Sequence, residues 1–265
     1  MTLLKVGVFA LAAVATSVQA ARLVDSPELA RAFRHSGLTG TFVVYDVQAD
    51  RMLVHNRKRA NTRYFPASTF KIPNTLIGLS TGAVSSVDQV LPYGGKPQRL
   101  KVWEQDMPLR EAIKVSNVPV YQELARRIGM QRMQEELPKL NYGNGKMGEV
   151  IDQFWLRGPL AISAVEQTRF LAKLSQDALP FSASAMAATR DIVLQCKTDN
   201  AALYAKTGWT EAPNPDIGWW VGWVRKEGRT YAFALNIDIV TDEDAAKRIP
   251  LGRAGLDALG VLPNQ

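Results

Sequence analysis

The chain has 265 residues, 46% of them hydrophobic, which is enough for the core of one domain or of one domain with a subdomain. Its formal net charge is +7, but the basic residues are scattered and no nucleic-acid motif accompanies them, so an ordinary solvated surface is expected and a nucleic-acid partner is not. The single cysteine, Cys196, excludes an internal disulfide, and we expect it to be a buried small apolar residue.

The first 20 residues have the pattern of a secretory signal peptide. Lys5 precedes an apolar run that ends near Val18, and Ala20 closes an A-x-A-like cleavage site. The run is too short to span a bilayer, and no later segment approaches about 20 apolar residues. We therefore expect residues 1–20 to be removed and residues 21–265 to form one periplasmic domain with no membrane contact after cleavage.

The N-terminal part of the mature chain predicts a hairpin followed by a helix. Thr41–Val47 and Arg51–His55 are apolar-rich strands on either side of a short polar turn. A helix is predicted from Ser68 to near Gly82. Pro73 cannot donate to the carbonyl four residues before it, which predicts a distorted opening turn.

Ser68 and Lys71 on this helix form an S-x-x-K tetrad. Residues three apart share a helix face, so the lysine amine can reach the serine hydroxyl. A serine is a poor nucleophile until a base takes its proton, and lysine becomes such a base only when burial disfavours its charged form. The tetrad therefore suggests a serine acyl-transfer enzyme.

Residues 104–195 are mostly helical in pattern, with breaks at prolines and glycines. Within them, Ser163–Leu174 predicts an amphipathic helix on which Glu166 has a structural role. Three strands and a helix then follow, and these are Ala202–Lys206, Ile217–Arg225, Thr230–Ile239 and about Asp244 to Leu259.

Two more elements follow the tetrad in an informative order. Ser116, in Ser116-Asn117-Val118, can relay a proton to a leaving nitrogen. Lys206 and Thr207 offer a cation and a hydroxyl to an anionic substrate group, and Gly208 lets a substrate lie close to the strand. Chance does not readily produce all three elements in this order.

Together with these elements, several segments give the chain a family resemblance from about residue 40 to its end. It resembles the class D (oxacillinase-type) serine β-lactamases, and the Y-G-N and F-W-L segments distinguish it from other serine β-lactamases. The matching segments are Pro66–Asn74, Ser116–Val118, Tyr142-Gly143-Asn144, Phe154-Trp155-Leu156 with Gly158-Pro159-Leu160, and Lys206-Thr207-Gly208.

The pattern alone supports only the α+β class. The resemblance implies a three-layer α/β/α arrangement like that of penicillin-binding transpeptidases. It has a five-stranded antiparallel sheet flanked by the terminal helices, a helical insertion at about residues 80–195, and the active site in the seam.

The resemblance also implies a modified lysine. Lys71 is N-carboxylated by CO2 in this family and acts as the general base, with no metal and no other cofactor. The reaction needs an uncharged amine in an apolar pocket, for which Phe70, Val118, Trp155 and Leu156 are the expected neighbours. The Trp155 indole N–H is expected to donate to the carboxylated side chain.

The remaining roles are implied by the same resemblance. Ser68 attacks a β-lactam carbonyl, and its backbone N–H forms an oxyanion hole with that of Trp209. Arg248 binds the substrate carboxylate, with Arg253 as the competing candidate. The other substrate-binding candidates are Thr207, Gly208, Leu156, Tyr142 and Asn144, although Tyr142 and Asn144 could equally shape a turn.

Two other reaction types fail on their own residues. A class A β-lactamase needs glutamate in E-x-x-x-N, but Phe170 stands where the asparagine would follow Glu166. Gly78–Gly82 fits the G-x-S-x-G pattern of α/β-hydrolases, which belongs on a strand-to-helix turn with a histidine downstream. Both histidines, His35 and His55, lie upstream.

The implied activity is hydrolysis of penicillin-type antibiotics, and hence antibiotic resistance. Two rivals remain. A D,D-peptidase shares the three elements, but Val118 and Trp155 favour the β-lactamase. A β-lactam sensor domain would be acylated and then stall. The sequence leaves open the oligomeric state and the range of substrates, which depends on loops near Trp103, Met107 and residues 210–215.

Overall fold

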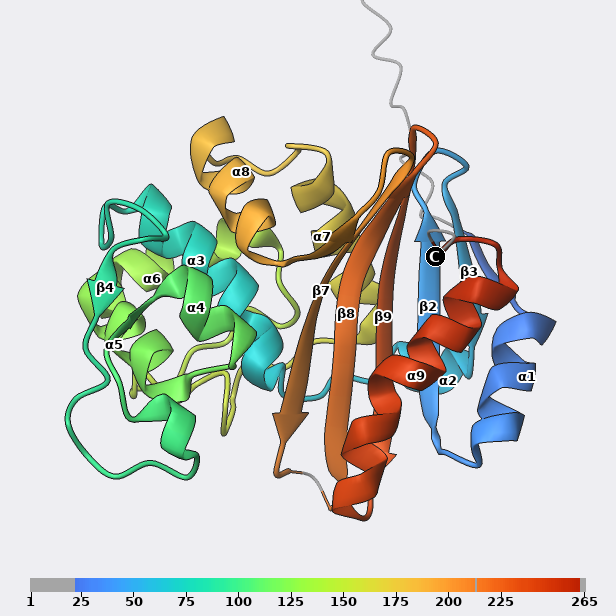
Figure 1. Cartoon of the computed structure of the whole chain (residues 1–265), viewed down its shortest axis with the longest axis horizontal. Helices are drawn as coiled ribbons and strands as arrows, with labels where there is room; N and C mark the ends of the chain where they lie inside the picture. The colour runs from blue at the N-terminus through green and yellow to red at the C-terminus, as the bar shows by residue number, and fades with distance from the viewer. Residues whose placement is uncertain (1–21, 213, 263–265) are drawn as a thin grey trace, which may run out of the picture.

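The computed structural model describes residues 22–212 and 214–262, so the expected signal peptide lies outside the described residues. One sheet of seven strands, in the order β1-β3-β2-β9-β8-β7-β6, runs through the molecule (Figure 1). Its neighbouring strands are antiparallel except β1 and β3, which are parallel. The strands are β1 (Arg22–Asp25), β2 (Gly40–Asp46), β3 (Arg51–His55), β6 (Leu194–Lys197), β7 (Ala201–Thr210), β8 (Asp216–Lys226) and β9 (Arg229–Ile239).

The sheet differs from the expected five antiparallel strands at its two edges. The hairpin β2–β3 and the strands β7, β8 and β9 are as predicted, except that β7 continues to Thr210. The additional strands β1 and β6 have four residues each, none of them buried, so they carry no alternating apolar pattern. The expectation for Cys196 was wrong, because it lies on edge strand β6 and is exposed.

Helices cover both faces of the sheet. On one face lie α1 (Pro27–Ser36) and α9 (Asp242–Ala258), and on the other lies α7 (Ala164–Ser175), which packs on β2, β8 and β9 (Figure 1). Side chains alternate along a strand, so the consecutive Trp219 and Trp220 of β8 enter the two different cores. The chain thus has the predicted α+β class with three layers.

Most of the other helices gather beside the β7–β6 side of the sheet (Figure 1). The helix that carries the tetrad opens with the predicted distortion, a 3₁₀ turn (Ala67–Phe70) that leads into α3. This group contains α3 (Lys71–Ser80), α4 (Leu109–Lys114), α5 (Val118–Ile128), α6 (Met130–Glu136), α8 (Ala183–Ile192), two further 3₁₀ turns (Lys101–Trp103 and Leu137–Leu140) and a small sheet of β4 (Val90–Leu91) and β5 (Met107–Pro108). The four-residue α2 (Arg57–Ala60) follows β3.

Within residues 22–212 and 214–262, no helix combines the length and the apolar character that a bilayer crossing requires.

Candidate active site

The tetrad residues Ser68 and Lys71 meet at the start of α3. Lys71 Nζ donates a hydrogen bond to Ser68 Oγ over 2.8 Å. The Lys71 residue is only 1% exposed, and its pKa is held well below the ordinary lysine value, first by burial and then by the positive charge of Lys206. An uncharged amine can accept a proton, so the pair is arranged for activation of the serine.

Aromatic side chains enclose Lys71. The centroid of the Tyr121 ring lies 5.3 Å from Nζ, and the Tyr121 hydroxyl is 2.9 Å from Thr75 Oγ1. Thr75 Oγ1 also donates to the Lys71 carbonyl over 2.8 Å. Phe70 stacks on Trp155 with 5.4 Å between ring centroids, and Trp155 is 1% exposed. Tyr121 and Thr75 were not predicted, although Thr75 lies one helical turn after Lys71.

Trp155 packs against the segment that carries the tetrad. Its backbone carbonyl accepts a hydrogen bond from the Ala67 N–H over 3.0 Å, directly before the nucleophile. Its indole N–H is not one of the buried polar atoms that lack a hydrogen-bond partner among the residues that the structure describes. The ring stacks on Phe70, the residue directly before Lys71 in the chain, and an indole N–H can only donate.

The turn that presents Ser68 is held by buried polar contacts. Ala67 adopts a left-handed conformation with φ of 47°. Thr69 Oγ1 donates to the Pro66 carbonyl over 2.7 Å and accepts from Gln167 Nε2 over 2.8 Å. Gln167, which comes from α7, is a supporting residue that the sequence did not reveal.

The second serine lies opposite the K-T-G strand. Lys206 Nζ donates to Ser116 Oγ over 3.0 Å. Lys206 is 6% exposed, and burial, with a further contribution from the charge of Arg248, lowers its pKa from 10.5 to about 7. Ser116 has a left-handed φ of 58°, and the next residue, Asn117, caps α5 by accepting from the Val120 N–H over 3.1 Å.

Strand β7 passes close to the Ser68 turn at Gly208. A Cβ atom at Gly208 would lie 3.0 Å from the Pro66 carbonyl oxygen and 3.1 Å from Thr69 Cγ2. The absence of a side chain therefore brings the backbone of β7, and with it Trp209, against the turn of the nucleophile. Lys206 Nζ is also 3.0 Å from the Thr207 carbonyl oxygen. All three predicted elements thus meet in one place.

Arg248 reaches this place from α9. Its Nη1 donates to the Gly208 carbonyl over 2.5 Å and its Nε to the Ala245 carbonyl over 2.6 Å. Burial lowers its pKa to about 10. No acidic side chain among the described residues pairs with it, so its charge is open to an anionic ligand. Arg253, the competing candidate, makes no such contact with β7 within the same part of the chain.

The remaining predicted side chains surround this arrangement. Val118 and Leu156 are half-buried. Tyr142 is 1% exposed, and its hydroxyl lies 3.4 Å from Thr69 Oγ1 and 3.3 Å from Gln167 Oε1. Asn144 donates to the Pro159 carbonyl over 2.9 Å. The contacts of Tyr142 and Asn144 are with the protein's own fold, which favours their turn-shaping alternative over substrate binding.

The structure confirms that Glu166 has a structural role. Ser163 and Glu166 form a capping box at the start of α7, and Glu166 also pairs with Arg63. Burial alone raises the pKa of Glu166, but hydrogen bonds from Arg63 and Ser163 bring it below the ordinary value. The G-x-S-x-G segment at residues 78–82 runs out of the end of α3, where no strand-to-helix turn exists.

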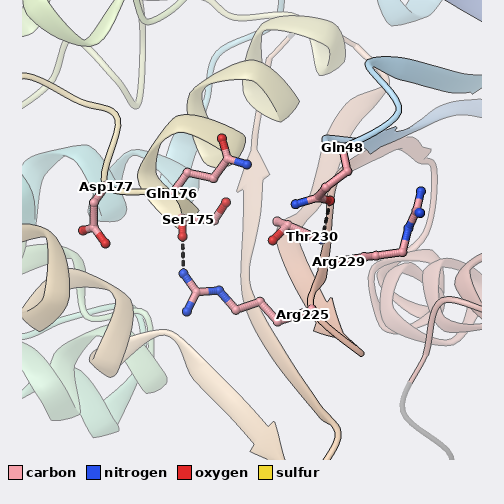
Figure 2. A pocket seen from close by; sticks show the side chains of 8 residues that line it. Gln48, Ser175, Gln176, Asp177, Arg225, Arg229 and Thr230 are labelled. Atoms are coloured by element: carbon pink, nitrogen blue, oxygen red, sulfur yellow. Dashed lines mark hydrogen bonds between the residues drawn. The ribbon is translucent and has the colours of Figure 1, made fainter.

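A polar hollow lies apart from these residues, at the C-terminal end of α7 (Figure 2). Arg225 donates to the Ser175 carbonyl there, and Gln48 Oε1 accepts from the Thr230 N–H over 2.8 Å. The first bond satisfies a carbonyl at the end of α7, and the second satisfies a backbone N–H of β9. No residue of the tetrad, of S-x-V or of K-T-G lines the hollow. Within the described residues, no three His, Cys, Asp or Glu side chains are grouped to hold a metal ion.

Comparison with known proteins agrees with the geometry. Residues 40–254 match the family described as penicillin binding protein transpeptidase domain. The sequence is 40% identical over 234 residues to β-lactamase OXA-5 of Pseudomonas aeruginosa, covering 87% of each chain. It is 38% identical over 224 residues to β-lactamase OXA-48 of Klebsiella pneumoniae, covering 84% of each.

Solved structures are similar over the same extent. The class D β-lactamase FUS-1 (OXA-85) of Fusobacterium nucleatum subsp. polymorphum has a TM-score of 0.87 at 45% identity, covering 91% of this chain and 100% of that one. A class D β-lactamase of Bacillus subtilis has a TM-score of 0.82 at 36% identity, covering 89% of this chain and 97% of that one.

Proposed function

The chain belongs to the class D serine β-lactamases, within the penicillin-binding-protein transpeptidase family, and on this premise we propose that it opens penicillin-type β-lactams through an acyl intermediate on Ser68. The observation that carries the proposal is the 2.8 Å contact between Ser68 Oγ and the buried Lys71 Nζ. A nucleophile and a desolvated base in contact are the minimum that such a reaction needs.

We further propose that Lys71 is N-carboxylated. CO2 reacts only with an uncharged amine, and burial lowers the pKa of Lys71 accordingly. The indole N–H of Trp155, a donor-only group on the ring that stacks against Phe70, is suited to hold the resulting anion. Carboxylated Lys71 would supply a general base for both the acylation and the deacylation half-reactions.

The other residues take their roles from position and chemistry. Ser68 Oγ attacks the lactam carbonyl, and the backbone N–H groups of Ser68 and Trp209 stabilise the oxyanion. Ser116, hydrogen-bonded to Lys206, passes a proton to the leaving nitrogen. Arg248 binds the substrate carboxylate beside Gly208.

A second proposal concerns where the protein acts. The signal-like pattern of residues 1–20 favours export to the periplasm, where penicillins meet their targets. Hydrolysis there would protect the cell, so we propose a role in antibiotic resistance.

Kinetics with a chromogenic cephalosporin test the hydrolytic function. We expect sustained turnover after any initial burst. A single stoichiometric burst would instead indicate a sensor or a slowly deacylating peptidase, and Lys71→Ala should abolish turnover.

The carboxylation is tested separately with acid-treated enzyme. Acid removes CO2 from a carbamate, so activity should fall at acid pH and recover after bicarbonate is added at neutral pH. If bicarbonate leaves a partly inactivated sample unchanged while the untreated enzyme turns over, the base is the amine itself.

A further inference from the structure

Trp209, directly after the K-T-G element, contacts two guanidinium groups from distant parts of the chain. Arg248 lies 6.0 Å from its ring centroid and Arg99 lies 5.7 Å from it. Arg99 precedes the 3₁₀ turn Lys101–Trp103 in the helical part of the molecule. Its Nη1 also donates to Glu211 Oε1 over 2.6 Å, immediately beyond the end of β7. Arg99 therefore attaches a loop of the helical part to the end of the K-T-G strand.

The other end of this loop is attached to the S-x-V segment. The Trp103 carbonyl accepts from Asn117 Nδ2 over 3.3 Å, and Trp103 Nε1 donates to the Val115 carbonyl over 3.0 Å. Both partners lie next to Ser116, whose hydroxyl is 3.0 Å from Lys206 Nζ. Residues 99–103 thus run from the Ser116 side of the site to its β7 side.

The two attachments differ in strength. Asn117 is fully buried, so its bond to Trp103 is partly shielded from water. The side chains of Arg99 and Glu211 are 63% and 74% exposed. Exposed ion pairs contribute little to stability, and salt screens them. The Trp103 end therefore acts as a fixed point, and the Arg99 end can be released without disturbing the core.

We propose that residues 99–103 form a bridge over the active site, and that the Arg99–Glu211 ion pair is a latch that selects β-lactams by side-chain size. This inference rests on the proposed β-lactamase function. A penicillin with a small side chain reacts while the latch is closed. A large, branched side chain needs the latch open, so its rate constant is reduced by the fraction of molecules that are closed.

The test compares acylation rate constants for two penicillins that differ only in side-chain size. The measured quantity is the ratio of the bulky to the small substrate's rate constant. Arg99→Ala and Glu211→Ala should each raise this ratio by up to about 5-fold, the upper end of the range expected for losing one exposed ion pair. Added salt should raise the ratio in the unaltered enzyme and have little effect in either variant.

Exchanging the charges of Arg99 and Glu211 distinguishes an effect of the ion pair from an effect of the individual side chains. Arg99→Glu combined with Glu211→Arg should return the ratio toward that of the unaltered enzyme, because the pair is restored with reversed sign. Lys139→Ala, which removes an exposed lysine paired with Glu136 in the 3₁₀ turn Leu137–Leu140, is the matched control and should leave the ratio unchanged.

The outcomes distinguish the two proposals. Equal changes in both rate constants, or a ratio that does not respond to salt, would overturn the latch while leaving the β-lactamase function intact. A protein that is acylated by neither penicillin would overturn both. Because acylation rather than turnover is measured, slow deacylation does not obscure the result.

Discussion

Lys206 on β7 and Ser116 before α5 are joined by a 3.0 Å hydrogen bond, and this bond links the sheet to the helical part of the molecule at the centre of the site. It brings a buried amine and a hydroxyl together near enough to Lys71 for the charge of Lys206 to act on it. The positive charge of Lys206 in turn lowers the pKa of Lys71, after the larger effect of burial. The two lysines are therefore coupled, and a change near one should be felt at the other.

Removing Arg248 should change both substrate binding and the titration of Lys206. Arg248→Ala should lower kcat/KM about 10- to 100-fold, as expected for losing a charged hydrogen-bonded pair with the substrate carboxylate. The pKa of Lys206, lowered to about 7 by burial and by Arg248, should rise when that charge is removed. NMR titration of labelled lysine checks the second effect. Arg253→Ala is the control, and equal losses in both variants would mean that the carboxylate site is misassigned.

Asn117 should matter more for activity than an ordinary helix cap. Asn117→Ala removes the cap of α5 and the bond to Trp103, and it frees the strained Ser116. We expect a loss of about 1 kcal/mol or more in the free energy of unfolding and a marked fall in kcat. Ser182→Ala removes the cap of α8, away from the site, as a matched control. Urea unfolding and steady-state kinetics should show similar stability losses but a fall in kcat only for Asn117→Ala.

The sequence predicted those features of the fold and the site that depend on residues close together in the chain. The distorted opening of α3 followed from Pro73, and the structural role of Glu166 followed from the amphipathic pattern of one helix, although the sequence analysis did not identify the capping box itself. Tyr121 and Gln167 could not be found in that way. Their contacts join residues 46 and 98 positions apart, and such contacts depend on how helices pack rather than on a repeating pattern.

The sheet edges were missed for a related reason. Strands β1 and β6 are short and contain no buried residue, so no alternation of apolar and polar residues marks them. The same reason explains the wrong expectation for Cys196. Cysteine is often buried, but Cys196 lies on an edge strand whose residues do not pack into the core.

Glu166 should affect stability and leave catalysis unchanged. Glu166→Gln weakens the capping box and the pair with Arg63, so we expect a loss of about 1 kcal/mol in the free energy of unfolding at neutral pH. The folded-state pKa of Glu166 is lowered, so its contribution is present above the ordinary value of 4.5 and is lost as the pH falls through the folded-state value. The variant and the unaltered enzyme should thus converge in stability at acid pH. A fall in deacylation rate would revive a class A type of mechanism.

Trp155 is best tested by keeping its ring and removing its donor. Trp155→Phe retains most of the packing against Phe70 but has no N–H to hold an anion on Lys71. Deacylation should slow more than acylation, and activity should depend more strongly on added bicarbonate. Pre-steady-state kinetics separate the two steps. If both slow equally and bicarbonate has no added effect, Trp155 acts by packing alone.

Lys71 itself should be a source of instability, because its amine is buried and its charged form is disfavoured. In Lys71→Met, an apolar side chain of similar length replaces it, and we expect a gain of about 1–4 kcal/mol in the free energy of unfolding at acid pH. The sign follows from linkage. The lysine keeps its proton up to about pH 10.5 in the unfolded chain, whereas the folded protein releases it at a lower pH. The free energy of unfolding of the unaltered enzyme therefore rises with pH, and the extra stability of Lys71→Met becomes smaller.

Urea unfolding at pH 5.5 and at pH 9 measures this difference. Lys139→Met replaces a half-exposed lysine paired with Glu136 and should show only a small effect with little pH dependence. Lys71→Met should be inactive and yet more stable, with the larger gain at the lower pH. If it proves less stable than the unaltered enzyme at pH 5.5, the charged amine must have favourable partners in the folded protein. The lowered pKa on which the proposed carboxylation depends would then be wrong.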